Sequence, residues 1–396
     1  MFLEVRMSHL MNTYARLPIA FTHGKGVWLW DTEGKRYLDG LSGIAVNTLG
    51  HAHPRLTSAL GAQINKLIHC SNIYRITEQE LLADKLCELS GMQEAFFCNS
   101  GCEANEAAIK LARMYSHQQG IDAPAIIVME KSFHGRTLAT LSATGSRKVQ
   151  AGFEPLTSGF VRVPYNDMEA IRQVAQHNNH VVAVLVEPIQ GEGGIRMPEA
   201  AYLQQLRQIC DKHNWLLMLD EVQCGMGRTG KWFAFQHTGI LPDVMTLAKG
   251  LGSGVPIGSC LTAGRAQGLF KPGNHGSTFG GNPLACTAGL TTLNIVEQDG
   301  LIAHAEALGK FLLQGFTSSL QGAKGVKEIR CLGLMIGIEL ANPCTELVSQ
   351  ALAKGLLINV TADNVIRLLP PLVMTREEAQ QLLDILCPLI IDFLQS

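Results

Sequence analysis

A lysine and an aspartate stand at the ends of two apolar runs, where buried strands would stop. Lys249 follows residues 243–248, Asp220 closes residues 215–220, and the two are 29 residues apart (249 − 220). A separation of about one strand–helix crossover would bring both to the same edge of a parallel sheet. A lysine amine can form an imine, and a carboxylate can keep a ring nitrogen protonated. Together they predict pyridoxal phosphate (PLP) chemistry, although a lysine at a strand end is more often solvated and inert.

A second candidate feature is the start of a predicted helix directly after residues 95–98. Ser100 and Glu103 have the spacing of a capping box, and Gly101 between them allows a close approach of the backbone. Free amides at such a helix start can bind a phosphate. The same pattern is also typical of an ordinary capped helix, so it indicates an anion site only in combination with other residues.

Two further loops carry side chains suited to a flat, charged ligand. After residues 125–129, Phe133 offers a ring that could stack on a cofactor, and Arg136 offers a guanidinium for a carboxylate. Both could equally be ordinary core and surface residues. After residues 181–186, we expect Glu187 to be a buried structural acid, whereas the glycines around Glu192 leave that carboxylate freer to act.

The elements that must position these residues are short apolar runs separated by helical patterns. Most runs lack polar alternation, as in strands that are buried on both faces. This pattern predicts an α/β protein with a mostly parallel central sheet flanked by helices. The runs occupy residues 95–98, 125–129, 181–186, 215–219 and 244–248.

Amphipathic segments near both ends of the chain predict a second, smaller α+β domain. We expect this domain to be built jointly from residues 1–55 and 286–396. Residues 56–285 would then form the large domain that binds the ligand.

The composition fits a globular protein with no nucleic-acid partner. The chain has 396 residues, of which 46% are hydrophobic and 17% charged, and a formal net charge of -2. Eleven cysteines without any C-x-x-C pair fit neither a disulfide framework nor a zinc ribbon, so we expect reduced thiols, a cytoplasmic protein and no metal site. No run approaches the length of a membrane span. The first residues contain Glu4 and no signal-peptide core, and Met7 offers an alternative start.

Three other motifs are weaker. Residues 225–231 (GMGRTGK) match a phosphate loop, but Trp232 stands where a Ser or Thr must hold magnesium. Residues 250–254 (GLGSG) lack the spacing of a dinucleotide fingerprint, which argues against a Rossmann oxidoreductase. His51 and His53 have no evident third metal ligand and are better explained as turn residues.

Six motifs together resemble those of the class III (ω-amino) aminotransferases, and they span most of the chain. The resemblance implies a PLP-dependent transferase of fold type I with a seven-stranded-type central sheet, usually a homodimer with active sites at the subunit interface. The motifs are NSGCEANE at 99–106, FHGR at 133–136, EPIQGEGG at 187–194, DEVQCGMGRTG at 220–230, AKG at 248–250 and HGSTFGGNP at 275–283.

The resemblance also implies roles in catalysis and in binding the cofactor ring. Lys249 would hold PLP and carry the proton between the substrate carbon and the cofactor, and Asp220 would keep the ring nitrogen protonated. Phe133 and Val222 would enclose the ring, and Gln223 would bind its phenolic oxygen.

The other cofactor contacts implied by the resemblance are Glu221, Gly101, Cys102 and, from the partner subunit, Thr278. Gly101 and Cys102 would bind phosphate chiefly through their amides. Cys102 departs from the Thr or small residue that is usual in the family. It keeps the amide but lacks a strong hydroxyl donor, which predicts a modest cost in PLP affinity.

For the substrates, the resemblance implies that Arg136 binds the carboxylate distal to the reacting amine, assisted by Ser277 of the neighbouring chain. Arg367 would bind the α-carboxylate of glutamate, and Glu192 would pair with Arg367 when an ω-amine substrate has no carboxylate there. Residues 43–46 (GIAV) and 49–54 (LGHAHP) strengthen the similarity to members that transfer the δ-amine of N-acetylornithine to 2-oxoglutarate.

Several alternatives share these motifs. Ornithine, succinylornithine, succinyl-diaminopimelate and 4-aminobutyrate would require the same ring chemistry. A PLP mutase or lyase on the same scaffold is a second kind of hypothesis, against which the two carboxylate-binding arginines argue. A binding protein without activity is a third, and the presence of both Lys249 and Asp220 argues against it.

Overall fold

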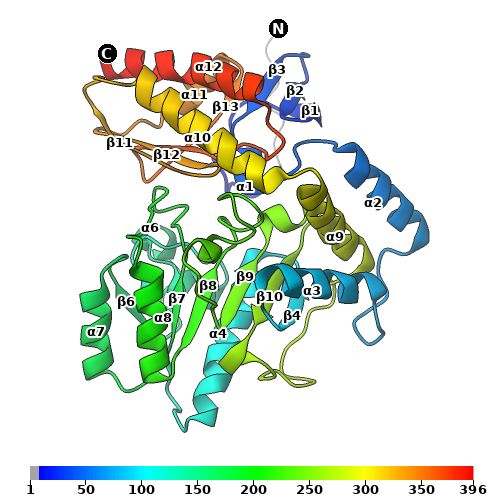
Figure 1. Cartoon of the computed structure of the whole chain (residues 1–396), viewed down its shortest axis with the longest axis vertical. Helices are drawn as coiled ribbons and strands as arrows, with labels where there is room; N and C mark the ends of the chain where they lie inside the picture. Colours follow the sequence, from blue (N-terminus) through cyan, green and yellow to red (C-terminus); the bar gives the residue numbers. More distant parts are fainter. Residues whose placement is uncertain (1–8, 396) are drawn as a thin grey trace.

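The structure is a computed structural model that describes residues 9–395. The expectations about a signal peptide and an alternative start at Met7 concern residues outside this range. Figure 1 shows a large body around one central sheet and a smaller body above it, which contains both the early strands β1–β3 and the last helix, α12. None of the helices in the described range has the length and apolarity needed to cross a membrane.

The large body is built on a seven-stranded sheet of order β4-β10-β9-β8-β7-β5-β6. Strands β9, β8, β7, β5 and β6 pair in parallel, whereas β10 is antiparallel to both β4 and β9. The predicted α/β fold with a mostly parallel central sheet is therefore confirmed. The strands are Glu94–Cys98 (β4), Ala125–Met129 (β5), Phe160–Val163 (β6), Val181–Val186 (β7), Leu216–Asp220 (β8), Val244–Leu247 (β9) and Gly258–Thr262 (β10).

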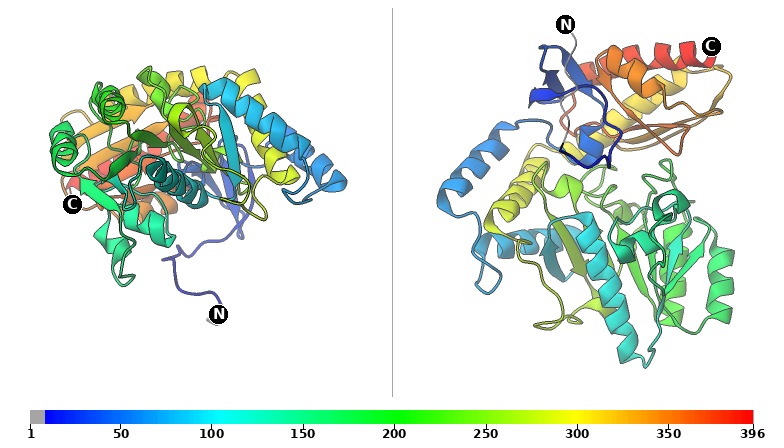
Figure 2. Two further views of the ribbon diagram at one scale, coloured as in Figure 1. Left: turned by 90° about the horizontal axis from the view of Figure 1, so that it is seen from below. Right: turned by 180° about the vertical axis from the view of Figure 1, so that it is seen from behind.

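Helices cover both faces of this sheet, as Figures 1 and 2 show. Strand β5 illustrates the consequence: Val128 packs in the cluster formed with α4, whereas Ile127 and Met129 pack in the cluster on the opposite face. Burial on both faces explains the lack of polar alternation in the strands. The helices are α4 (Gly101–Gln118) on one face and α3 (Thr77–Ser90), α7 (Met168–His177) and α8 (Tyr202–His213) on the other.

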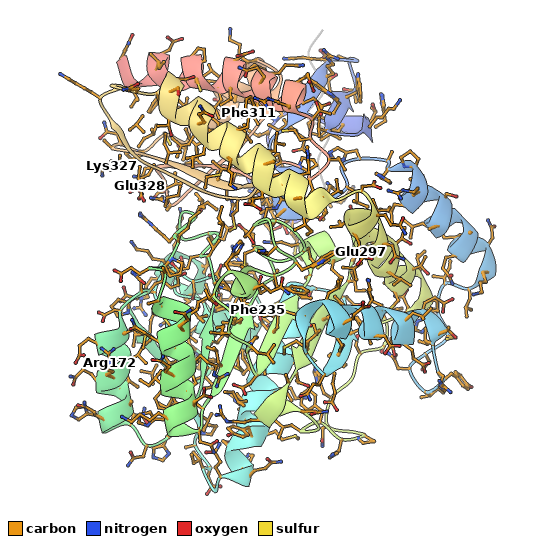
Figure 3. The ribbon with its side chains drawn as sticks, in the orientation of Figure 1. Arg172, Phe235, Glu297, Phe311, Lys327 and Glu328 are labelled. Atoms are coloured by element: carbon orange, nitrogen blue, oxygen red, sulfur yellow. The ribbon has the colours of Figure 1, made fainter. Side chains whose placement is uncertain are left out.

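Short helices lie in the connections between the strands and longer helices of the large body. Figure 3 shows that the exposed Arg172 on α7 points away from the body, whereas Phe235 in η1 lies inside it. The short helices are α5 (Leu138–Ala143), α6 (Arg147–Gln150), η1 (Ala234–His237), η2 (Lys249–Leu251) and η3 (Gly264–Ala266).

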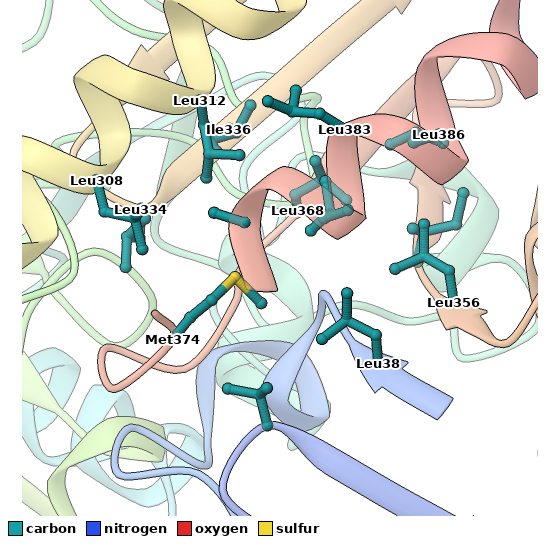
Figure 4. Close-up of a cluster of buried hydrophobic side chains, with 14 of the residues drawn as sticks. Leu38, Leu308, Leu312, Leu334, Ile336, Leu356, Leu368, Met374, Leu383 and Leu386 are labelled. Carbon is teal, nitrogen blue, oxygen red and sulfur yellow. The ribbon is translucent and has the colours of Figure 1, made fainter. Parts of the chain in front are cut away.

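The smaller body contains two four-stranded sheets, β1-β2-β3-β13 and β11-β12-β15-β14. Figure 4 shows part of its core, where Leu308 and Leu312 of α10 and Leu383 and Leu386 of α12 pack in one cluster with Ile336 of β12. The strands are Phe21–Lys25 (β1), Trp28–Asp31 (β2), Arg36–Asp39 (β3), Val326–Leu332 (β11), Met335–Leu340 (β12), Leu356–Leu357 (β13), Asn359–Thr361 (β14) and Val365–Leu368 (β15). The helices are α1 (Ser42–Ala45), α10 (Leu301–Ser319), α11 (Leu347–Ala353) and α12 (Arg376–Gln395).

Both ends of the chain contribute to this smaller α+β body. Strand β3 pairs in parallel with β13, and Leu38 lies opposite Leu356. The predicted domain boundaries, after residues 55 and 285, fall in the first turns of α2 (Pro54–Lys66) and α9 (Pro283–Gln298). Helix α9 packs against α2 and α3 and also contacts α10, so it connects the two bodies. The boundaries themselves stay a prediction.

Candidate active site

One cavity of ≈ 400 Å³ is lined by residues at or just after the ends of β4, β5, β7, β8 and β9. The carboxyl ends of parallel strands are the usual place for a ligand in an open α/β sheet. The predicted site residues that line the cavity are Gly101, Cys102, Phe133, Arg136, Glu192, Asp220, Val222, Gln223 and Lys249. The predicted site residues that do not line it are Glu221, Ser277, Thr278 and Arg367.

Lys249 begins η2, two residues after the last residue of β9, and has a positive φ of 42°. This backbone conformation is uncommon for a side-chain-bearing residue and marks a sharp change in chain direction at the cavity. Burial lowers the pKa of the Lys249 ammonium below its usual value, and the carboxylate of Glu192 only partly opposes the shift. A lower pKa increases the fraction of neutral amine, which is the form that attacks a carbonyl group.

Asp220 is the last residue of β8 and is 3% exposed. Its Oδ2 accepts hydrogen bonds from Nδ2 of Asn105 (2.7 Å) and Nδ1 of His134 (2.8 Å), and its Oδ1 accepts one from the amide of Val222 (3.1 Å). A carboxylate only accepts, so Nδ1 of His134 carries the proton. Three donors from three segments fix the direction of this carboxylate at the cavity.

Asn105 and His134, the two side chains that donate to Asp220, were not predicted as site residues. Nδ2 of Asn105 also donates to the carbonyl of His134 (2.8 Å), and its Oδ1 accepts from Oγ1 of Thr246 (2.7 Å). Nε2 of His134 is buried, and no partner for it lies within the described range. One signal in the sequence could have identified Asn105: it is a polar residue beside the apolar positions Ala104 and Ala108 of a buried helix face.

Glu187 is buried, as expected, and it connects two loops of the site. Its Oε1 accepts the amide of Phe133 (2.9 Å), and its Oε2 accepts the amide of Gly191 (3.1 Å). Burial raises the pKa of Glu187 to about 7, while His134 acts in the opposite direction. The loops that carry Phe133 and Glu192 are thus held by one carboxyl group.

The N-terminus of α4 faces the cavity. Oγ of Ser100 accepts the amide of Glu103 (3.2 Å), as predicted for an N-cap. The Glu103 carboxylate accepts the amide of Asn99 (2.6 Å), one residue earlier than in a standard capping box. The amides of Gly101 and Cys102 lie in the first turn and have no acceptor within the helix, so they suit a phosphate group.

Gly101 permits a close contact between this helix start and the loop after β8. A Cβ atom at position 101 would lie 2.7 Å from Cγ1 of Val222, closer than two carbon atoms can approach. Val222 and Phe133 both line the cavity and give it apolar surface. These contacts fit a flat ring whose phosphate end reaches the start of α4.

Cys102 connects α4 to the loop that carries Arg136. Its Sγ accepts hydrogen bonds from the amides of Arg136 and Thr137, both at 3.3 Å, and lies 3.2 Å from Oγ1 of Thr140. The guanidinium of Arg136 lies 5.8 Å from the centre of the Phe133 ring. The exposed Arg136 is therefore held at the mouth of the cavity through its backbone, which leaves its side-chain donors available for a ligand.

Arg367 is fully buried on β15 and joins the cavity through two of the lining residues. Its Nη1 lies 2.6 Å from Oε1 of Glu192 and 3.3 Å from Oε1 of Gln223, and its Nε donates to Oδ1 of Asn359 (2.9 Å). Nη2 has no partner among residues 9–395. Burial alone would raise the pKa of Glu192, but Arg367, together with Lys249 and Gln223, outweighs burial and lowers this pKa below its usual value. Arg367 and Glu192, the two residues predicted to separate when a substrate carboxylate binds, are thus paired in the structure.

Ser277 and Thr278 lie in a separate hollow, together with Phe96 and His275. Asn99 borders both that hollow and the main cavity, and its Nδ2 donates to Oγ of Ser277 (3.3 Å). A single chain therefore does not bring Ser277 and Thr278 into the cavity that contains its own Lys249.

Glu221 is 1% exposed and points away from the cavity, so we withdraw its assignment as a cofactor contact. Its two carboxylate oxygens accept the amides of Ala234 and Phe235, both at 2.8 Å. Sγ of Cys224 also donates to Oε2 (3.3 Å). Glu221 follows Asp220 directly, and the chain turns there. The Asp220 carboxylate therefore lies at the cavity, whereas the Glu221 carboxylate binds the backbone of residues 234–235.

Glu221 provides a test of the pH dependence of stability. Burial raises the pKa of Glu221 to about 7 from the usual 4.5, so the folded protein retains a proton that the unfolded chain releases. The free energy of unfolding should therefore fall as pH rises from 4.5 to 7. We expect E221Q, which cannot titrate, to gain up to about 3 kcal/mol relative to the natural protein between pH 5 and pH 8. Denaturant unfolding at both pH values measures this difference.

E80Q is the matched control, because the side chain of Glu80 is 44% exposed and Arg75 lowers its pKa. This variant should show no such gain above pH 5. A constant difference between E221Q and the natural protein across the range would contradict the assignment to Glu221.

Comparison with known proteins supplies the family. The sequence profile described as "Aminotransferase class-III" matches residues 10–390. The chain belongs to aminotransferase class III. A relative from Nitrosomonas europaea, named acetylornithine aminotransferase, is 63% identical over 390 residues, which cover 98% of this chain and 99% of the relative. The resemblance predicted from the six motifs is confirmed.

Solved structures support the same fold for this class III aminotransferase. An ornithine aminotransferase from Toxoplasma gondii, described with partial occupancy of PLP at its active site, has a TM-score of 0.93 and 32% identity. The match covers 98% of this chain and 94% of that one. An acetylornithine aminotransferase from Elizabethkingia anophelis has a TM-score of 0.86 and 36% identity, with 97% of each chain covered. The predicted PLP-dependent transferase fold is confirmed.

The residues of the cavity fit PLP, the cofactor of class III aminotransferases. Lys249 offers an amine whose pKa is lowered, and Asp220 offers a carboxylate that is fixed by three donors. Gly101 leaves space where a Cβ would clash, at the start of a helix whose first amides have no helical acceptor. These are the groups that an aldehyde, a ring nitrogen and a phosphate require.

Proposed function

We propose that this class III aminotransferase transfers the δ-amine of N2-acetyl-L-ornithine to 2-oxoglutarate. The products are N-acetyl-L-glutamate 5-semialdehyde and L-glutamate, formed in a ping-pong cycle. The observation that carries the choice of substrate is the 63% identity, over 98% of the chain, to a relative named acetylornithine aminotransferase. We place the reaction in arginine biosynthesis and the protein in the cytoplasm.

The cavity residues divide the chemistry between them. Bound PLP supplies an aldehyde for the amine and a ring that draws electrons from the reacting carbon. The neutral amine of Lys249 would hold the aldehyde and would take and return the proton at the reacting carbon. Asp220, oriented by Asn105 and His134, would keep a proton on the ring nitrogen. Removing the Asp220 charge would weaken the ring's capacity to accept electrons.

The phosphate and the ring face have their own contacts. We infer that the amides of Gly101 and Cys102 hold the phosphate and that Phe133 and Val222 enclose the ring. Thr278 would add a hydroxyl from a second copy of the chain, with Ser277 beside it. The position of both residues in a hollow outside their own chain's cavity supports a homodimer in which each chain completes the other's site.

Two guanidinium groups suit substrates with two carboxylates. In the ω-amine half-reaction, Arg136 binds the carboxylate distal to the amine, and Glu192 stays paired with Arg367. In the glutamate half-reaction, the α-carboxylate replaces Glu192 on Arg367, whose Nη2 is otherwise without a partner in the described chain. The exchange avoids leaving a buried cation without a counter-ion.

E192A tests this exchange. Without Glu192, Arg367 has no counter-ion when an ω-amine is bound but still gains one from glutamate. We therefore expect the ratio of the N-acetylornithine rate to the glutamate rate to fall by about tenfold or more in single-turnover half-reactions. E199A removes an exposed glutamate of the same loop and should leave the ratio unchanged. An unchanged ratio in E192A would show that the exchange does not occur.

The substrate itself is tested by comparing kcat/KM for several amines, each with 2-oxoglutarate. The panel is N-acetylornithine, succinylornithine, ornithine, succinyl-diaminopimelate and 4-aminobutyrate. Ornithine is the second candidate, because a solved structure with a TM-score of 0.93 to this chain is named ornithine aminotransferase. A clear preference for N-acetylornithine supports the proposal. A preference for an unacylated amine would show that the proposed substrate and the proposed role of Arg136 are both wrong.

The same preparation tests the alternatives outside transamination. Stable accumulation of the pyridoxamine form with glutamate would exclude a mutase or lyase. Bleaching of the cofactor absorbance by an amino donor would exclude a binding protein without activity.

A further inference from the structure

A buried arginine outside the cavity connects the loop after Asp220 to the strand that carries Arg367. Arg228 belongs to the GMGRTGK segment, which failed as a phosphate loop and has no part in the proposed chemistry. It is 2% exposed and does not line the cavity. Its Nη1 donates to the carbonyl oxygens of Leu334 (3.2 Å) and Pro370. Its own carbonyl oxygen accepts the amide of Leu334 (2.8 Å).

These contacts lie at the ends of two paired strands. Leu334 precedes β12, Pro370 follows β15, and Gly337 of β12 lies opposite Arg367 of β15. Each contact is three residues from this pair (337 − 334 and 370 − 367). The Arg228 guanidinium therefore binds the backbone of both strands, at positions three residues from the Gly337–Arg367 pair.

The main chains also cross tightly at this point. Gly333 has a φ of +55°, and a Cβ there would lie 2.5 Å from the carbonyl oxygen of Arg228. A side chain at position 333 would push residues 228–229 away from β12. The separation between the loop after β8 and the strand pair is thus set by the Arg228 side chain and by backbone contact together.

The surroundings of Arg228 are unusual for a cation. No carboxylate forms an ion pair with it among residues 9–395, and its guanidinium donates to two backbone carbonyl groups. Burial lowers the pKa of Arg228 to about 9, and Asp39 only partly opposes the shift. A buried cation without a counter-ion costs stability. The presence of Arg228 is therefore better explained by the geometry that it imposes on β12 and β15 than by a gain in stability.

We propose that Arg228 is a positioning residue that fixes the place of Arg367 relative to Lys249, and so sets the affinity for 2-oxoglutarate and glutamate. The inference rests on the proposed function, in which Arg367 binds the carboxylate next to the reacting carbon. Gln223, five residues before Arg228 (228 − 223), touches Arg367 directly, so a shift between the two bodies changes this contact. N-acetylornithine has no carboxylate at Arg367, so we expect its half-reaction to depend much less on Arg228.

R228M and R228K test the proposal in the PLP-loaded enzyme. In ping-pong kinetics, kcat/KM for each substrate reports its own half-reaction. In R228M we expect kcat/KM for 2-oxoglutarate to fall by about 10- to 100-fold, mainly through KM, because small misplacements of a binding group have effects of this size. The value for N-acetylornithine should change by less than about threefold. R228K should be intermediate, because an ammonium keeps the charge but lacks the planar fork.

R207M is the matched control. Arg207 is a largely buried arginine whose Nη1 lies 2.7 Å from Oδ2 of Asp243, a residue that precedes β9 and does not line the cavity. This variant should lower the Tm without changing the ratio of the two kcat/KM values. The dissociation constant of PLP should be the same in R228M, R228K and the natural protein.

Equal losses with both substrates, or no loss with either, would overturn the role of Arg228. If R228M does not fold, the ratio in R228K decides by the same criterion. Failure of the proposed function would look different, because the natural protein would then not use N-acetylornithine. In that case, the effect of R228M on kcat/KM is compared between 2-oxoglutarate and the ω-amine that the natural protein does accept.

Discussion

K249A is expected to lower the rate of amine transfer by about 10⁴-fold or more. In the proposed mechanism, the lysine supplies both the amine that holds the cofactor aldehyde and the group that moves the proton at the reacting carbon, and proton transfer alone typically contributes up to about 10⁴-fold. Its position at the cavity and its lowered pKa fit both tasks. Single-turnover rates with N-acetylornithine and with glutamate measure the loss.

A second measurement on K249A is independent of activity. Borohydride should fix PLP covalently to the natural protein, at a peptide containing Lys249, and should not do so in K249A. K354A, which removes an exposed lysine, is the control and should behave like the natural protein. Covalent fixation in K249A at another lysine would contradict the assignment.

D220N is expected to lower kcat by at least about 10²-fold while leaving the protein folded. The amide keeps an acceptor for Asn105 or His134 but removes the charge that would keep the ring nitrogen protonated. Loss of one preorganised electrostatic contact of this kind typically costs 10²- to 10³-fold. The measurement is kcat together with the PLP dissociation constant and the absorbance of the bound cofactor.

D243N is the matched control for D220N. Asp243 is also buried at an end of a strand of the central sheet, but it binds Arg207 and the amide of Leu217 (2.8 Å) outside the cavity. D243N should destabilise the fold and leave kcat of the folded enzyme unchanged. If D220N kept the kcat of the natural protein with PLP fully bound, Asp220 would not act on the ring.

The apolar runs predicted the positions of the buried parallel strands well. Each of the five predicted runs corresponds to one strand, and the ends of run and strand differ by at most one residue. Strands β6 and β10 were missed for a physical reason. β6 carries the charged Arg162, and β10 begins with Gly258 and Ser259, so neither shows an uninterrupted apolar run. An antiparallel strand between parallel ones also leaves no mark on local periodicity.

The strand ends likewise predicted which residues meet at the cavity, because parallel strands deliver their last residues to one edge. What the sequence could not provide was the direction of each side chain after the strand. Glu221 follows Asp220 and was assigned to the cofactor, yet it binds the amides of Ala234 and Phe235. Asn105 was overlooked because its partners come from three other segments, which only tertiary contacts bring together.

Because β3 pairs with β13, the smaller body can be completed only late in the synthesis of the chain. All seven strands of the central sheet lie between residues 94 and 262, so that sheet can form while translation continues. Strand β3 leaves the ribosome much earlier than its partner at Leu356–Leu357 and keeps an unpaired edge until nearly the whole chain exists. A truncation at either terminus therefore damages the same body, the one that carries Arg367. Under the role proposed for Arg367, a nascent chain would bind 2-oxoglutarate only after its last tenth or so has emerged.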